Sequence, residues 1–214
     1  MKRSMIVMLL VVSLATLSVA FPAPQMMRGQ GGSPLLSKPA VELRTAVRKL
    51  WEDHITWTRL YIVSALAGLE DVGEVAKRLL ANQDDLGNAI KPYYGDAAGV
   101  KLAQLLRDHI LIATDVVKAA KMGAAAELTA AQNKWTANAD EIAAFLSRAN
   151  PNWPLAAVTD MLHKHLALTT DEVVSRLKKD WAADIAAYDK GHNHMLMFAD
   201  VMAEGIVKQF PAKF

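Results

Sequence analysis

The stretch LWEDHI at residues 50–55 recurs as LLRDHI at 105–110 and as MLHKHL at 161–166. Between these stretches lie two further related ones, ANQDDL at 81–86 and ANADEI at 137–142. The chain therefore repeats with a period of about 55 residues. Such a repeat is a supersecondary unit that buries its apolar face against its neighbours. We interpret each unit as one helical hairpin, so that three hairpins make the domain.

The composition around these stretches favours helices. Ala, Leu, Val, Lys, Glu and Asp dominate from Pro39 onward, and no segment alternates apolar and polar residues with a period of two. Glycine, proline and polar clusters interrupt the pattern at regular intervals. We expect helices at residues 40–66, 70–92, 96–121, 125–149, 154–177 and 180–209. Because short connections force antiparallel neighbours, the sequence predicts an all-α, up-and-down antiparallel bundle of about six helices built from three repeated hairpins.

Each predicted helix carries an apolar stripe with steps of three and four residues, which is typical of a buried face. In the first helix the stripe includes Leu43 and Val47, and in the sixth it includes Ile185, Met195 and Met202. One polar residue interrupts the stripe in every helix. From the first helix to the sixth these residues are His54, Asn82, His109, Asn138, His165 and His192.

The polar residues are separated by 28, 27, 29, 27 and 27 residues, and the predicted turns lie halfway between them. Residues that are equidistant from a turn lie at the same height in an antiparallel hairpin. We therefore expect one polar layer across the middle of the bundle. His54, His109 and His165 in particular should be buried and close in height.

Two interpretations of this layer remain open. Buried imidazoles and amides can satisfy one another and fix the helix register, as a buried Asn does in a coiled coil. Alternatively, imidazoles from facing helices can bind a transition metal ion, with Asp85 and Glu141 completing or supporting the site. The candidate metal ligands are His54, His109, His165, His192, Asn82, Asn138, Asp85 and Glu141. Haem held by two of the histidines is a further alternative.

Two other histidines are not included among these candidates. His163 lies off the apolar stripe, so we expect it on a solvated face. His194 is two residues from His192, and side chains two apart on a helix point to different sides. The two therefore cannot chelate one ion together.

The first residues are typical of an export signal. A positive start at residues 1–3 precedes an uncharged apolar run of 16 residues, which ends in Ser18-Val19-Ala20. This run is shorter than the roughly 20 residues that span a bilayer comfortably. We expect cleavage after Ala20, export to the periplasm, cell surface or medium, and no membrane association afterwards. The expected organisation is a signal peptide at 1–20, a flexible leader at 21–38, the bundle at 39–210 and a tail at 211–214.

The composition limits the classes of function. The absence of cysteine excludes disulfides, zinc–thiolate sites, iron–sulfur clusters and covalent c-type haem attachment. Without Lys2 and Arg3 the chain has 22 basic and 22 acidic residues, so we expect no nucleic-acid partner. No phosphate loop, dinucleotide fingerprint or nucleophile elbow is present, and we lean against an enzyme. A small ligand or a protein partner stays open.

Four strings carry a resemblance to a known group of proteins. They are WEDHITWTR at 51–59, ANADEIAAFL at 137–146, ANPNWP at 149–154 and AADIAAYD at 182–189. Together they resemble an uncharacterised family of small exported bacterial all-helical proteins, whose members sometimes carry the labels glycosyltransferase or acetylglutamate kinase. Both of those activities need an α/β nucleotide-binding framework, which this sequence does not supply. The resemblance implies the helical fold and export, and it transfers no catalytic residue.

Overall fold

A computed structural model describes residue 35 and residues 37–214. Its six α-helices are α1 (Lys38–Ala67), α2 (Val72–Tyr94), α3 (Asp96–Met122), α4 (Ala125–Ala149), α5 (Leu155–Leu177) and α6 (Trp181–Gln209), followed by the 3-10 helix η2 (Pro211–Lys213). The predicted all-α, up-and-down bundle is confirmed for the described residues, with every helix end within two residues of its expected position. The predicted signal peptide and most of the predicted leader lie outside them.

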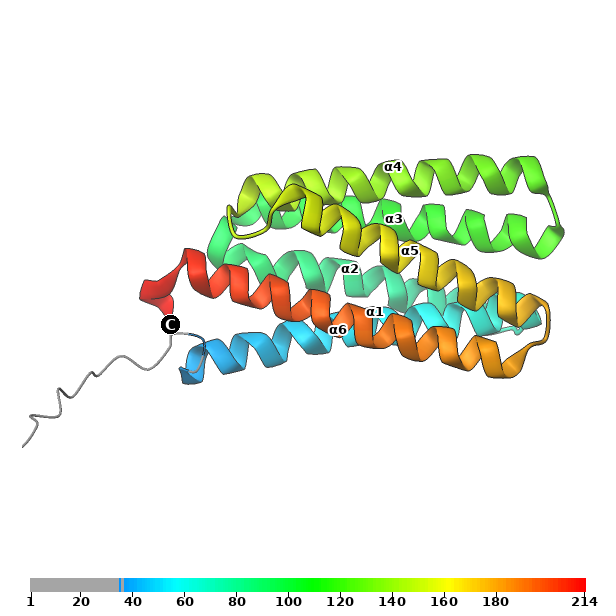
Figure 1. Cartoon of the computed structure of the whole chain (residues 1–214), viewed down its shortest axis with the longest axis horizontal. Helices are drawn as coiled ribbons and strands as arrows, with labels where there is room; N and C mark the ends of the chain where they lie inside the picture. Colours follow the sequence, from blue (N-terminus) through cyan, green and yellow to red (C-terminus); the bar gives the residue numbers. More distant parts are fainter. Residues whose placement is uncertain (1–34, 36) are drawn as a thin grey trace, which may run out of the picture. The chain divides into compact units, whose positions relative to one another are not determined.

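The six helices form a closed arrangement (Figure 1). Each helix packs against the next along the chain, and α6 returns to pack along α1. The turns at residues 68–71, 123–124 and 178–180 lie at one end of the bundle, because each of them joins the two helices of a hairpin. Helices α1, α3 and α5 also contact one another. Side chains at the same height on these three helices therefore meet in the interior.

Local sequence signals set the helix ends. The Ser37 hydroxyl oxygen accepts a hydrogen bond from the Ala40 backbone N–H at 3.2 Å, which caps the start of α1. Gly68 ends the same helix in the left-handed conformation, with φ of 71°, which glycine adopts without steric cost. Lys179 has φ of 61° in the turn before α6, so this turn carries no glycine to mark it in the sequence.

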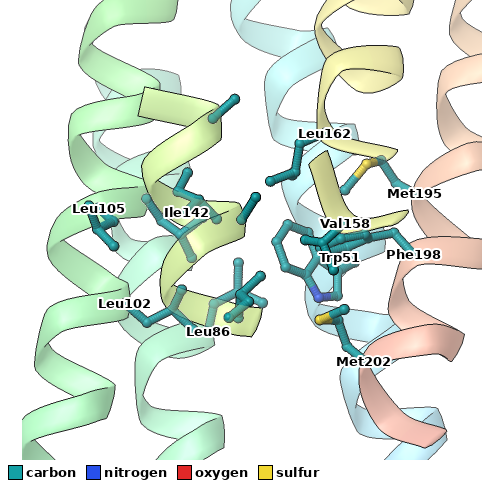
Figure 2. Close-up of a cluster of buried hydrophobic side chains, with 14 of the residues drawn as sticks. Trp51, Leu86, Leu102, Leu105, Ile142, Val158, Leu162, Met195, Phe198 and Met202 are labelled. Carbon is teal, nitrogen blue, oxygen red and sulfur yellow. The ribbon is translucent and has the colours of Figure 1, made fainter. Parts of the chain in front are cut away.

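The apolar stripes meet in a core that contains side chains from all six helices. Trp51 of α1 lies edge-on against Phe198 of α6, with ring centroids 4.9 Å apart. Figure 2 shows this pair next to Met202, with Leu86 of α2 and Ile142 of α4 in the same cluster. Within residues 37–214, no helix combines the length and the apolar character that a membrane span requires.

The first half of α6 presents a different face to the core than its predicted stripe. Ile185 is 56 % exposed, whereas Ala187 and Gly191 are buried. From Met195 to Met202 the buried face is the predicted one. The difference arises because Ala and Gly are spread over several faces of the first half, so that hydrophobicity alone does not select the face that packs.

Candidate functional site

Three imidazoles lie together in the middle of the bundle. His54 of α1, His109 of α3 and His165 of α5 are 2 %, 3 % and 3 % exposed. The ring centroid of His165 is 5.6 Å from that of His54 and 6.1 Å from that of His109. The prediction that these residues are buried and close in height is confirmed. The layer exists because the first helices of the three hairpins meet at the centre of the bundle.

His109 has a protein partner at each ring nitrogen. The Trp135 indole N–H donates to His109 Nε2 at 3.0 Å, and His109 Nδ1 lies 2.7 Å from Asn138 Oδ1. Since an indole only donates, Nε2 accepts and the proton is on Nδ1, which donates to the amide oxygen. Burial lowers the pKa of His109 to about 4, and the hydrogen bond to Asn138 opposes this shift. His109 is therefore a neutral imidazole with no free lone pair.

One hydrogen bond recurs in all three hairpins. Asn82 Nδ2 donates to the Leu50 carbonyl at 3.0 Å, and Asn138 Nδ2 donates to the Leu105 carbonyl at 3.1 Å. In the third hairpin, His194 Nε2 lies 2.7 Å from the carbonyl oxygen of Met161, to which it donates. Each acceptor is four residues before the buried histidine of its hairpin. The recurrence is compatible with three repeated hairpins, and it joins the second helix of each hairpin to the first at the same height.

His192 does not join the layer, although the sequence pattern placed it there. Its side chain is 26 % exposed, and its Nε2 lies 3.3 Å from Glu52 Oε1. Because Gly191 and Met195 face the core, the side chain that reaches into the third hairpin is that of His194. The spacing of 29 residues from His165 to His194 equals the spacing from His109 to Asn138 and is the sequence signal for this assignment.

His54 contacts a glutamine that the sequence pattern missed. Gln83 is fully buried, and its Nε2 donates to the Leu79 carbonyl at 2.7 Å and lies 3.4 Å from His54 Nδ1. Burial first, and then the neighbouring His109, lower the pKa of His54 to about 3. Gln83 directly follows Asn82, so its place beside the stripe concealed it in the sequence.

His165 carries a buried nitrogen without a hydrogen-bond partner, its Nδ1. Its pKa lies well below the ordinary value because of burial first, and then because of the neighbouring imidazoles of His54, His109 and His194. A buried unpaired nitrogen of this kind costs about 1–3 kcal/mol. Of the three central imidazoles, His165 is the one that the surrounding protein satisfies least.

The two candidate carboxylates lie away from the layer. Asp85 has a half-exposed side chain 3.8 Å from Arg78 Nη1, and Glu141 is exposed. Three residues along a helix turn a side chain by about 300°, which displaces both carboxylates from the narrow buried face. Among residues 37–214, no group of three or more His, Asp or Glu side chains is arranged to hold a metal ion. The structure thus brings together the imidazoles and amides and leaves these acids outside.

A buried ion cluster, which sequence analysis did not find, joins the ends of α1, α5 and α6. We define it by Arg59, Glu172, Arg176 and Asp184. Arg59 Nη1 donates to Glu172 Oε1 at 2.8 Å and also bonds Asp184, which in turn accepts from Arg176 Nη1 at 2.8 Å. Burial raises the pKa of Glu172. Burial acts the same way on Asp184, but the hydrogen bonds from the two arginines outweigh it and lower its pKa.

Two small apolar cavities lie on opposite sides of the imidazole layer. One, of about 20 Å³, is lined by residues including Ile62, Ile110 and Val173, and the other, of about 40 Å³, by residues including Trp51 and Leu102. A site for a small molecule or a cofactor such as haem occupies roughly 300–1,000 Å³. Neither cavity next to the layer has room for such a group in this conformation.

No protein-family model, curated protein or solved structure matches the chain. The candidate function therefore depends on the geometry of the layer itself.

Proposed function

We propose that the protein is an exported, non-catalytic helical scaffold, a structural or protein-interaction module, in which the imidazole–amide layer fixes the register of the helices. The observation that carries the proposal is the bonding of His109. Its Nε2 accepts from Trp135, its Nδ1 donates to Asn138, and that amide in turn donates to a backbone carbonyl. A lone pair that already accepts a hydrogen bond is not free to ligate a metal ion.

The recurring hydrogen bond supports the register role. The side chains of Asn82, Asn138 and His194 each reach one backbone carbonyl of the partner helix. Sliding the second helix of a hairpin by one residue along the first removes this bond and leaves buried polar groups unpaired, at about 1–3 kcal/mol each. The layer would thus select one register among many that an alanine- and leucine-rich bundle can adopt.

Export is proposed on sequence grounds. The positive start, the apolar run and the small residues Ser18 and Ala20 form the three-part pattern of a secretory signal. Comparing the mass of the protein recovered outside the cytoplasm with that of the full chain tests this part. A mass that begins at Phe21 supports cleavage after Ala20, whereas protein retained in the cytoplasm at full length contradicts export.

A double-mutant cycle on His109 and Asn138 tests the register role. Each single change to leucine should lower the free energy of unfolding by about 1–3 kcal/mol, because it leaves the other side chain with an unpaired buried group. The double variant should cost less than the sum of the two, by about 1 kcal/mol or more. His163 and Asp140, an exposed pair at 2.7 Å, provide the matched control, with an expected coupling below about 1 kcal/mol. Additive losses at His109 and Asn138 would contradict the proposal.

A transition-metal site at His54 and His165 is the second candidate. The specific observation in its favour is the buried, unpartnered Nδ1 of His165, whose ring lies 5.6 Å from that of His54. Elemental analysis of protein purified without chelator or affinity-tag metal distinguishes the two candidates. Less than about one-tenth equivalent of any transition metal supports the scaffold, whereas about one equivalent that His165→Leu removes supports the metal site.

A further inference from the structure

We propose that the imidazole layer makes the bundle acid-sensitive, because protonation of His54, His109 and His165 separates the three hairpins and opens the core while the helices persist. This goes beyond the register role, since a layer made of amides alone would fix the register without responding to acid. The proposal rests on where the three rings lie and on what surrounds them.

The three rings belong to three different hairpins. His165 is in contact distance of both other rings, with centroids 5.6 Å from His54 and 6.1 Å from His109. A positive charge on more than one of them places like charges close together in an apolar interior, where repulsion is strong. That repulsion acts between hairpins. The bond that recurs within each hairpin, such as Asn82 to the Leu50 carbonyl, involves none of these three rings, whereas His109 also bonds Trp135 and Asn138 of its own hairpin.

Within residues 37–214, the side chains that contact the three rings carry no negative charge. The groups that approach the three rings are amides, indoles and another imidazole: Trp51 from α1, Gln83 from α2, Trp135 and Asn138 from α4, and His194 from α6. The carboxylates nearest along the chain are bonded elsewhere: Asp53 to Lys49, Asp108 to Gln104, Asp140 to His163, and Glu172 to Arg59. In residues 37–214, no carboxylate hydrogen-bonds a ring of the layer. A charge that arises there is therefore uncompensated.

The direction of the pH dependence follows from linkage. Burial lowers the pKa of His54 to about 3 and that of His109 to about 4, and it lowers the pKa of His165 strongly. In an opened chain, histidine titrates near 6.5. The opened state therefore binds more protons, so the stability is complete above about pH 6.5 and is lost as the pH falls toward the folded-state values. Glu172, whose pKa burial raises, acts in the opposite direction.

The expected effect is large. Between about pH 8 and pH 5, each buried imidazole multiplies the equilibrium constant of unfolding by about 30, and the three together by about 3 × 10⁴. Ordinary carboxylates titrate near pH 4 and change little in this interval. The slope over this interval therefore reports the imidazoles.

Urea unfolding of the full chain between about pH 8 and pH 5 tests the proposal, with His165→Leu as the variant and His163→Leu as its control on the same helix. His165→Leu is suitable because Nδ1 of His165 has no partner to lose. The control residue is 43 % exposed and lies outside the buried layer. Between about pH 8 and pH 5, the equilibrium constant of unfolding should increase by a factor about 30-fold smaller for His165→Leu than for the parent. For His163→Leu the factor should equal that of the parent. The proposal would be overturned if this equilibrium constant increased by the same factor in His165→Leu and in the parent, or by less than about 30-fold in the parent.

A second measurement needs no variant and so remains decisive if His165→Leu does not fold. Calorimetric unfolding of the parent near pH 5.5, in two buffers of different ionisation enthalpy, counts the protons taken up. More than one proton supports the proposal, and one or fewer overturns it. At the acid transition, the far-ultraviolet circular dichroism should persist while the near-ultraviolet signal is lost and a hydrophobic dye binds. Simultaneous loss of both signals would overturn the separation of intact hairpins.

Discussion

The buried polar groups of this bundle are stabilised in two contrasting ways. The imidazole layer is neutral, because burial disfavours the charged form of His54, His109 and His165. The ion cluster is charged, and each of its acids has an arginine partner at hydrogen-bonding distance. The difference depends on position, since the layer is at the centre of the bundle whereas the side chains of Arg59 and Arg176 remain 18 % and 19 % exposed.

Asp184 and Asp200 form a matched pair for testing the ion cluster. Both are aspartates of α6 with two arginine partners, but the side chain of Asp184 is 1 % exposed and that of Asp200 is 20 % exposed. We expect Asp184→Asn to lower the free energy of unfolding by about 3 kcal/mol, because it leaves Arg176 without its carboxylate partner and Arg59 with Glu172 alone in a largely buried cluster. Asp200→Asn should cost about 1 kcal/mol or less. Urea unfolding near pH 7 measures both, and equal losses would contradict the assignment.

The histidines of the layer should differ in what they contribute at neutral pH. His109→Leu leaves the Trp135 N–H and the Asn138 oxygen unpaired, so we expect a loss of about 1–3 kcal/mol. His165→Leu removes a nitrogen that has no partner, so we expect a loss below about 0.5 kcal/mol or a gain. Thermal melting at about pH 8 measures both losses while the imidazoles are neutral in the folded and unfolded states, so that only the hydrogen bonding differs. A larger loss for His165→Leu than for His109→Leu would show that the bonding of the layer is assigned wrongly.

At the scale of elements, a tryptophan in the α4–α5 connection determines how closely that connection approaches α6. Trp153 is 2 % exposed, and its indole N–H donates to the Val201 carbonyl at 3.1 Å. Gly205, one turn further along α6, leaves the space that the ring fills. A Cβ atom at this position would lie 2.7 Å from Trp153 Cδ1 and Cε2, and closer still to Nε1. The connection and α6 therefore depend on each other.

Gly205→Ala should lower the free energy of unfolding by about 1–3 kcal/mol, because the added methyl group overlaps the indole and neither backbone can yield without loss of packing. Gly73→Ala is the matched control in helix α2, where a Cβ atom would meet no atom within 4 Å. The control should gain at most about 0.5 kcal/mol from helix propensity, because Gly73 is the second residue of α2 and the full difference applies to helix interiors. Urea unfolding of both variants checks the contrast. If Gly205→Ala is as stable as the parent, Trp153 is not seated against the helix.

At the scale of the whole molecule, the helices were predictable from the sequence because their signals are local. Stripes with steps of three and four residues and breakers such as Gly68 and Gly123 locate the six helices within two residues. The central histidines were predictable for the same reason, since turn positions fix the height of a residue in a hairpin. The height of a residue in the bundle follows from the number of residues between it and the nearest turn, and this number can be read from the sequence.

The remaining features depend on rotation about the helix axis and on contacts between distant segments. A change of two positions selects His194 in place of His192, and in an alanine-rich helix the pattern of hydrophobic residues does not distinguish between them. The ion cluster joins Arg59 to Asp184 across 125 residues of sequence, and surface charges of the same types occur along every helix. Gln83 was missed because it flanks the stripe and does not interrupt it. Tertiary packing decides all three.

The packing of α6 along α1 has a topological consequence. Arg44 and Arg48, near the start of α1, reach Asp200, near the end of α6, so the two chain ends of the bundle lie at the same end (Figure 1). A circular permutant with these ends joined by a flexible linker and new termini at the exposed Gly123 turn should retain every interface. We expect it to fold with the parent's far- and near-ultraviolet circular dichroism; a permutant without the near-ultraviolet signal would contradict this. The three hairpins then form a cycle, in which the point where translation starts is arbitrary.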